Sequence, residues 1–323
     1  MFAKPLAQAI AFAALASAGV LAHAQEYPTK PVRLVVTYPP GGGADIMARL
    51  IAQKLSVSLG QSFVVENKPG ASGQIAALSV AKSAPDGYTL MVDASSYAVN
   101  PTLYPKLPYD TQKAFAPITT LALFPNMLVT SPDFPAKSAK ELVAMAKAKP
   151  GAIAYASSGN GSAQHLSGEL FKQQAGIDLQ HIAYKGGGPA MNDVIAGHVP
   201  VFFANMASGL GHVKSGKLKA LASTGAKRSP NMPDLPTMAE AGVPGYEVYE
   251  WNVLVAPAGT PPAIINKLHA EVKKALADKD VKERLDGLGA EIVATPPAET
   301  EKFLNGQIEK WARVVKAGNI KVD

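Results

Sequence analysis

The segment that decides the fold of this chain is Thr37-Tyr38-Pro39-Pro40-Gly41-Gly42-Gly43-Ala44-Asp45, a glycine-rich connection between two apolar stretches. Before it, residues 32–36 form a short apolar run rich in β-branched side chains, which predicts a buried strand. After it, apolar residues recur at the spacing of one helix face, at Met47, Leu50, Ile51 and Leu55. Asp45 stands where the N-cap of this helix is expected.

The glycines would form a tight turn that leaves the helix N-terminus open to a ligand. A helix N-terminus presents unpaired N–H groups and about half a positive charge, which favours an anion. A plain strand-to-helix connection is the alternative interpretation. The turn does not end in the Gly-Lys-Ser/Thr of a Walker A loop, and Ile46 stands where a dinucleotide fingerprint needs a glycine. A small carboxylate is therefore a more suitable ligand than a nucleotide.

Composition excludes several classes of function. The chain has 323 residues and 47% hydrophobic content, enough for two domains of ordinary size. It contains no cysteine, which excludes disulfides, thiol catalysis and cysteine metal sites. The formal net charge is +6, but the basic residues are scattered, so nucleic acid is not an expected partner. A mildly basic surface would attract anionic solutes.

The first 24 residues have the features of a signal peptide. Lys4 gives a basic start, an alanine-rich apolar run covers residues 6–21, and Ala22-His23-Ala24 is a cleavage site of the A-x-A type. We expect export and cleavage after about Ala24, with a retained membrane anchor as the alternative. No later stretch is long and apolar enough to span a bilayer.

The mature chain alternates strand and helix patterns, which predicts an α/β fold with mainly parallel sheets. Strands at residues 63–67 and 88–92 complete a first βαβαβ unit, and residues 98–124 look irregular. A second unit begins near residue 127. There, the predicted strands at 153–156 and 181–184 each lead into a glycine-rich turn and a helix, as residues 32–36 do in the first unit.

Two such lobes, each aiming a helix N-terminus at a shared cleft, would hold a dicarboxylate from both ends. Each helix terminus contributes about 0.3–1 kcal/mol when exposed and up to about 2 kcal/mol when partly buried. The tail elements have no glycine-rich anion loop and are expected to pack back on the first lobe. We therefore predict lobe 1 from residues 25–125 plus 249–323, and lobe 2 from residues 126–248.

No catalytic constellation stands out. The chain has no Gly-x-Ser-x-Gly elbow and no His-Glu-x-x-His motif, and its histidines lack metal-ligand spacing, so neither a metal nor a cofactor is expected. His165 could contact a bound anion or serve only in packing. Ser157, Ser158 and Ser162 would be nucleophiles only with a partnered base, and otherwise act as hydroxyl donors and caps. Tyr184 could line the cleft or simply end a strand.

The chain resembles a known family, the Bug-type substrate-binding proteins of tripartite tricarboxylate transporters. The first resemblance is in the stretch from Tyr38 to Asp45. It continues through Glu66-Asn67-Lys68-Pro69-Gly70-Ala71-Ser72-Gly73, Ser158-Gly159-Asn160-Gly161-Ser162-Ala163-Gln164-His165-Leu166, Tyr184-Lys185-Gly186-Gly187-Gly188-Pro189-Ala190, Trp251-Asn252 and Pro257-Ala258-Gly259-Thr260-Pro261. These motifs cover nearly the whole mature chain and are specific when taken together.

The resemblance implies a periplasmic, two-lobe binding protein of type II-like fold that passes a small carboxylate to the membrane components of a transporter. It also implies that glycine loops of both lobes hold a carboxylate, and that the loop after the third strand faces the ligand. We expect the protein to be a monomer and not an enzyme. The expected ligand-binding residues are Tyr38, Pro40, Gly41, Gly42, Gly43, Asp45, Ser95, Ser96, Tyr97, Ser158, Gly159, Asn160, Gly161, Ser162, His165 and Tyr184.

The chain departs from the family at the distal part of the pocket. Relatives often have Gly-Thr-Ser/Gly-Thr-His where residues 93–97 read Asp-Ala-Ser-Ser-Tyr, and many have Val-Asp-Leu-Met-Phe-Asp at residues 199–204. The ligand therefore stays open among dicarboxylates, aromatic acids and acidic amino acids, and Tyr97 suggests stacking on a ring. An exported α/β enzyme and a ligand-presenting partner of a sensor kinase are the alternative functions. Asp45 stays open as well, between a helix cap and a polar contact to the ligand.

Overall fold

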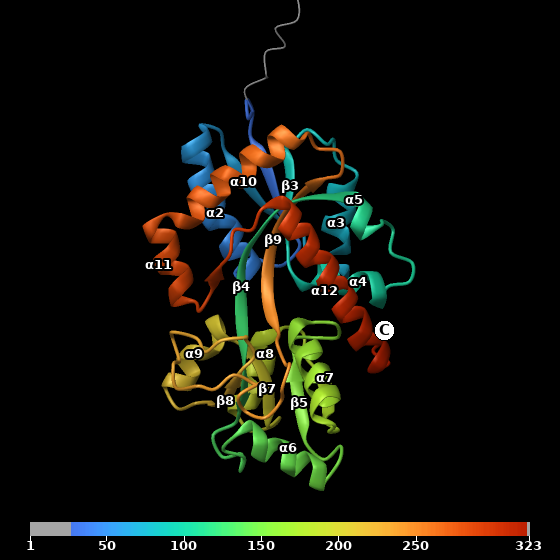
Figure 1. The fold of residues 1–323 in the computed structure, drawn as a ribbon, viewed down its shortest axis with the longest axis vertical. Helices are drawn as coiled ribbons and strands as arrows, with labels where there is room; N and C mark the ends of the chain where they lie inside the picture. Colours follow the sequence, from blue (N-terminus) through green and yellow to red (C-terminus); the bar gives the residue numbers. More distant parts are fainter. Residues whose placement is uncertain (1–26, 322–323) are drawn as a thin grey trace, which may run out of the picture.

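The computed structural model describes residues 27–321, and the predicted signal peptide lies outside this range. The chain forms two α/β lobes, one above the other in Figure 1, built on a ten-stranded sheet that runs through both. Its main strand order is β2-β1-β3-β9-β4-β7-β5-β6, and β8 and β10 pair with β4 off this path. The predicted α/β, two-lobe fold is confirmed. None of the described helices is long and apolar enough to cross a membrane.

The first lobe contains the predicted βαβαβ unit. Strand β1 (Val32–Val36) pairs in parallel with β2 (Phe63–Asn67) on one side and β3 (Thr89–Asp93) on the other. The connections hold α2 (Gly43–Leu59) and α3 (Gln74–Ala81), the latter after a 3-10 turn at Ala71–Gly73. The region expected to be irregular, residues 98–124, is instead ordered. It holds the end of α4 (Ser95–Leu103), then α5 (Thr111–Ala114) and the start of β4 (Phe115–Thr130).

The second lobe repeats the arrangement. Strand β5 (Ala154–Ser157) pairs in parallel with β6 (Gln180–Ala183) and β7 (Val201–Asn205). Helices α6 (Ala139–Ala148), α7 (Ala163–Ala175), α8 (Gly187–Ile195) and α9 (Met206–Lys214) accompany them, and β8 (Lys219–Ser223) pairs with β4. Ser138 caps α6 through a hydrogen bond from the Glu141 amide, while the Glu141 carboxylate accepts from the Lys137 amide.

Two strands connect the lobes. Strand β4 pairs with β9 (Tyr249–Pro257) from Phe115 to Pro125, and with β7 and β8 from there to Thr130. The change of partner between Pro125 and Asn126 supports the proposed lobe boundaries, 25–125 plus 249–323 against 126–248. The chain then forms α10 (Pro262–Ala277), α11 (Lys279–Gly287), the short strand β10 (Glu291–Ile292) and the final helix α12 (Pro297–Ala317).

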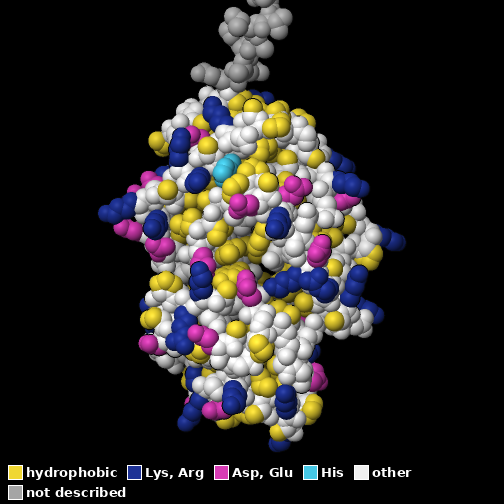
Figure 2. All heavy atoms as spheres, in the orientation of Figure 1, with side chains coloured by type: hydrophobic (Ala, Val, Ile, Leu, Met, Phe, Trp, Pro, Cys, Tyr) yellow, Lys and Arg dark blue, Asp and Glu magenta, His cyan; other side chains and the backbone are white. Residues whose placement is uncertain are grey.

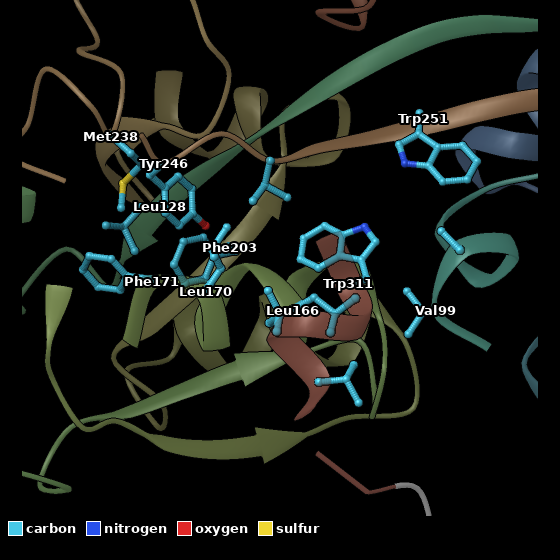
Figure 3. Packing of buried hydrophobic residues seen from close by; sticks show 14 of the residues in the cluster. Val99, Leu128, Leu166, Leu170, Phe171, Phe203, Met238, Tyr246, Trp251 and Trp311 are labelled. Atoms are coloured by element: carbon cyan, nitrogen blue, oxygen red, sulfur yellow. The ribbon is translucent and has the colours of Figure 1, made fainter. Parts of the chain in front are cut away.

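Helix α12 contacts both lobes. Its buried Trp311 belongs to one apolar cluster with Val99 of α4 and Leu166 of α7, so side chains of both lobes share a core there (Figure 3). Farther along α12, the Val314 carbonyl accepts a hydrogen bond from Gln173 of α7 at 3.0 Å. The tail helix therefore ties the lobes together on this side of the molecule.

One glycine of α7 allows a close approach inside the second lobe. A Cβ on Gly168 would lie 2.2 Å from Cε2 of Tyr155, whose ring is fully buried and has no room to retreat. Although alanine favours a helix by about 1 kcal/mol over glycine, we expect Gly168→Ala to lower the free energy of unfolding by about 1–3 kcal/mol through overpacking.

The matched control for this prediction is Gly306→Ala in α12, where an added Cβ meets nothing within 4 Å. This variant should be unchanged or more stable by up to about 1 kcal/mol. Urea denaturation of both variants measures the difference, and similar unfolding midpoints would contradict the overpacking at Gly168.

Candidate functional site

The loop between β1 and α2 is exposed from Pro39 to Gly43. The N-cap of α2 is Gly42 rather than Asp45, which lies inside the helix as its third residue. The prediction of an Asp45 N-cap was wrong because the helix begins two residues earlier, at Gly43. Gly42 has no side chain to accept a hydrogen bond, so α2 begins without a side-chain cap. The N–H groups of its first turn therefore lack a partner from a capping side chain, which suits an anion.

The Asp45 carboxylate is buried under this loop and is fully engaged there. Its Oδ2 accepts from the Gly41 amide at 2.9 Å and from Arg49 Nε at 3.1 Å. Its Oδ1 accepts from Asn67 Nδ2 at 2.9 Å and lies 2.9 Å from Arg49 Nη2. Burial alone would raise the pKa of Asp45, but these hydrogen bonds lower it below its ordinary value. The carboxylate thus fixes the shape of the loop and balances the charge of Arg49.

The ends of β1 and β3 meet at a second carboxyl group, Asp93. Its Oδ1 accepts from Thr37 Oγ1 at 2.7 Å, from Ser96 Oγ at 2.6 Å and from the Ala94 amide at 2.7 Å. The side chain is buried, and burial raises the pKa of Asp93 in spite of these donors. Ser96 Oγ in turn accepts from the Tyr38 hydroxyl at 3.0 Å. Tyr38 and Ser96, both predicted site residues, are therefore joined beside the α2 loop.

Ser96 and its neighbours Ser95 and Tyr97 all lie in the first turn of α4. Ser95 is buried at the start of α4. The Tyr97 ring is also buried, 5.8 Å from the ring of Phe115, and its hydroxyl donates to the Thr111 carbonyl at 3.2 Å. Tyr97 is thus packed inside the first lobe, where its ring is already covered by protein.

The second-lobe loop, residues 158–162, follows β5 and leads into α7. Ser162 is the N-cap, accepting from the His165 amide at 3.2 Å, as the predicted hydroxyl cap requires. Gly159 and Gly161 have positive φ angles of 130° and 74°, which glycine adopts without strain. A Cβ on Gly161 would lie 2.5 Å from Leu103 of α4, so this loop touches the first lobe.

The His165 side chain packs behind the 158–162 loop and bonds to its backbone. Its ring is buried and stacks on His181 of β6 at a centroid distance of 3.8 Å, while its Nδ1 accepts from the Gly161 amide at 3.0 Å. Burial, with the neighbouring His181, lowers the pKa of His165 to about 3, so the ring is neutral near pH 7. The hydrogen bond from the Gly161 amide to His165 therefore stabilises the conformation of the 158–162 loop.

The serine of this region that lies next to a histidine is not accessible. Ser157 Oγ lies 2.6 Å from Nε2 of His181, which resembles a nucleophile–base pair, but Ser157 is fully buried and its hydroxyl also bonds the Gly159 backbone. The Tyr184 hydroxyl donates to the Asp193 carboxylate of α8 at 2.7 Å. Among residues 27–321 there is no group of histidine and acidic side chains that could hold a metal ion.

With this geometry in place, comparison with known proteins identifies the family. A profile described as "Tripartite tricarboxylate transporter family receptor" matches residues 47–320. The protein BugT of Bordetella pertussis is 40% identical over 312 residues, which cover 95% of this chain and 96% of that protein. This chain belongs to the tripartite tricarboxylate transporter receptor family.

Solved structures agree with the receptor assignment. The R. palustris protein Rpa4515 with adipate has a TM-score of 0.83 and 38% identity, over 91% of this chain and 99% of that one. MatC of Rhodopseudomonas palustris with bound malate has a TM-score of 0.79 and 34% identity, over 90% and 100%. The periplasmic binding protein BugD has a TM-score of 0.80 and 36% identity, over 91% and 99%. The chain is thus a solute-binding receptor and not an enzyme.

Several residues that lie next to these loops in the receptor were not among the predicted site residues. Thr37, Asn67 and Asp93 each lie at or just beyond the end of a predicted strand, and the rule that ligands bind at strand carboxyl ends could have found them. Arg49 is one helical turn after Asp45, a spacing that pairs side chains. Glu250 of β9, joined to Gln164 of α7 by a hydrogen bond from Gln164 Nε2, gave no local signal.

Proposed function

We propose that this receptor captures a small carboxylate between its lobes and delivers it to the membrane components of a tripartite tricarboxylate-type transporter. The observation that carries the proposal is the N-terminus of α2, which begins in the exposed Gly41–Gly43 loop without a side-chain cap. Unpaired N–H groups with a partial positive charge favour a carboxylate there. The ligand itself would then complete the cap of α2.

The second lobe supplies the opposite side. Its 158–162 loop leads into α7 and touches α4, which starts in the Ser95–Ser96 loop of the first lobe. Helix α8 also begins without a side-chain cap, at Gly186, next to Ser158. A carboxylate held at both lobes agrees with the adipate and malate in the two Rhodopseudomonas structures. We propose the same chemical class here, with dicarboxylates, aromatic acids and acidic amino acids as its members.

Within the predicted set of site residues, we propose two roles. Direct contact falls to the glycine loops and their hydroxyl neighbours, which are Pro40, Gly41, Gly42, Gly43, Ser95, Ser96, Ser158, Gly159, Asn160 and Ser162. Tyr38, Asp45, Tyr97, Gly161, His165 and Tyr184 would position these loops through the hydrogen bonds described above. The receptor would act as a monomer.

A thermal-shift series tests the proposed function. A ligand that binds only the folded state adds about 2.7 kcal/mol of stability at 100 times its dissociation constant, which raises the melting temperature. We expect such a rise with at least one of malate, adipate, succinate, aspartate, glutamate and an aromatic acid, in protein refolded to remove bound ligand. No rise with any of them would contradict carboxylate capture, and consumption of a ligand that binds would favour an enzyme.

A further inference from the structure

A carboxyl group that the proposed function does not use lies where the lobes meet. Glu250 is the second residue of β9, opposite Phe124 of β4, next to the point at which β4 changes partners. Its side chain meets Gln164 in the first turn of α7 and Asn205 at the end of β7. Its side chain is only partly exposed, and we infer that the exposed part faces a solute held between the lobes. At the level where the lobes meet, acidic and basic side chains are interspersed on the face shown in Figure 2.

The surroundings of Glu250 contain amides rather than cations. Asp45 is held by Arg49, whereas no ion pair involves Glu250 among residues 27–321. Burial raises the pKa of Glu250 to about 7, and the hydrogen bonds from Asn205 and Gln164 only partly offset this. The Glu250 carboxyl group therefore has no cationic partner among the described residues and can accept a hydrogen bond from a donor group on a ligand.

The polar groups next to Glu250 are incompletely bonded. Asn126 pairs directly with Asn205 across β4 and β7, which puts their side chains on one face of the sheet. Asn126 is fully buried, and neither its side-chain oxygen nor its nitrogen has a hydrogen-bond partner within the described part of the chain. A buried amide of this kind normally finds a partner, which a ligand or a water molecule would supply here.

Gln164 connects Glu250 to the second-lobe loop. Gln164 Nε2 donates to Glu250, while its Oε1 accepts from Ser158 Oγ at 2.9 Å. The amide has one donor end and one acceptor end, and a hydroxyl has one hydrogen. When Glu250 is ionised, the Ser158 hydrogen is thus committed to Gln164, and Ser158 presents only lone pairs to a ligand. When Glu250 is protonated, a reversed amide can donate to Ser158 and free its hydrogen for an anion.

We propose, as a refinement of the proposed function, that Glu250 acts through Gln164 and Ser158 as the specificity-determining residue of this receptor. It favours ligands that carry a hydrogen-bond donor, such as an ammonium, beside their carboxylates over plain dicarboxylates. The ionised group attracts the ammonium and turns Ser158 into an acceptor. The protonated group removes both effects, so the preference weakens as the pH falls.

Among residues 27–321, the side chains that bond to Glu250 are the amides of Gln164 and Asn205, neither of which titrates. Strand β4 carries no titratable residue. On α7, burial lowers the pKa of His165 to about 3, and Glu169 is paired with Lys172. On β9, burial raises the pKa of Tyr249 to about 12, and Glu291 of β10 lies against this tyrosine rather than against Glu250. We therefore assign the pH dependence between 5.5 and 8 to Glu250, and the Glu250→Gln variant tests this assignment.

Matched ligand pairs test the proposal. Aspartate and succinate, and likewise glutamate and glutarate, differ only by the ammonium group, so the affinity ratio within a pair isolates its contribution. Calorimetry on the mature receptor should show an amino-acid preference that grows by about tenfold from pH 5.5 to pH 8, as expected for a charge-assisted hydrogen bond. Glu250→Gln should lower the ratio at pH 8 by about tenfold and remove its pH dependence.

Two further variants make the result decisive. Glu247→Gln changes an exposed carboxylate three residues earlier and should leave the ratio unchanged. Ser158→Ala removes the hydroxyl that Gln164 links to Glu250. It should reduce the pH dependence of the affinity ratio even if Glu250→Gln fails to fold. An unchanged ratio in Glu250→Gln, or in Ser158→Ala where the former does not fold, would overturn the proposal. So would the absence of binding by both amino acids, while binding of malate or adipate would still support carboxylate capture.

Discussion

Replacing Trp311 by alanine is expected to lower the free energy of unfolding by about 3–5 kcal/mol, the usual cost of removing a buried tryptophan from a packed core. Trp311 is 1% exposed and shares a cluster with Val99 of the first lobe and Leu166 of the second (Figure 3). The cavity would therefore open between α12, α4 and α7, where both lobes meet. The measurement is urea denaturation followed by circular dichroism.

Trp311→Phe is the matched control. It keeps an apolar ring in the cluster and gives up only part of the volume and the hydrogen bond from the indole N–H to Gln307, which lies on the same helix. We expect a smaller loss, about 1–2 kcal/mol. If alanine and phenylalanine at position 311 destabilise the protein equally, the packing explanation is wrong. If alanine has no effect, the shared core does not stabilise the receptor.

The second large effect is expected for Asp45→Asn. All four contacts to the Asp45 carboxylate come from N–H donors, on Gly41, Arg49 and Asn67. An asparagine offers one acceptor oxygen and places its own NH₂ against the donors at the other oxygen. We expect a loss of about 1.5–3 kcal/mol in stability, the range for hydrogen bonds to a charged group, and weaker binding of every carboxylate alike because the Gly41–Gly43 loop loses its support.

This result differs from what a ligand-contacting Asp45 would give. In that case only amino-bearing ligands would bind more weakly, and plain dicarboxylates would bind as well or better. Calorimetry with aspartate and succinate on the mutant separates the two. Glu283→Gln is the stability control, because its ion pair with Lys279 is exposed on both sides and should contribute less than about 1 kcal/mol.

Stability of the Asp45 contacts should also depend on pH in a fixed direction. The folded-state pKa of Asp45 is lowered, so its contribution is present above the ordinary pKa of an aspartate and is lost as the pH falls through the lower, folded value. An acid titration of wild type against Asp45→Asn should therefore show their difference in stability shrinking at low pH. A difference that grows instead would assign the opposite sign to this interaction.

The sequence alone determined much of the architecture. Residues 32–36, 63–67 and 88–92 are short runs rich in apolar or β-branched side chains, and the parallel strands Val32–Val36, Phe63–Asn67 and Thr89–Asp93 form there as that pattern predicts. Ser162 caps its helix as expected, because capping depends on residues only two or three positions apart. Such local rules, together with the glycine loops, were enough to locate the helix ends that we propose bind an anion and to show the family resemblance.

Only the tertiary structure decided how the remaining side chains are used. Asp45 fitted two interpretations until Arg49 and Asn67 were seen on both of its oxygens, and Asn67 reaches it from the neighbouring strand β2. Tyr97 looked suited to stack on a ligand, yet its ring packs on Phe115 inside the first lobe. Glu250 and Gln164 are 86 positions apart and meet because β4 and β9 bring the lobes together. Contacts between distant segments depend on how the strands pair, and no local pattern records that pairing.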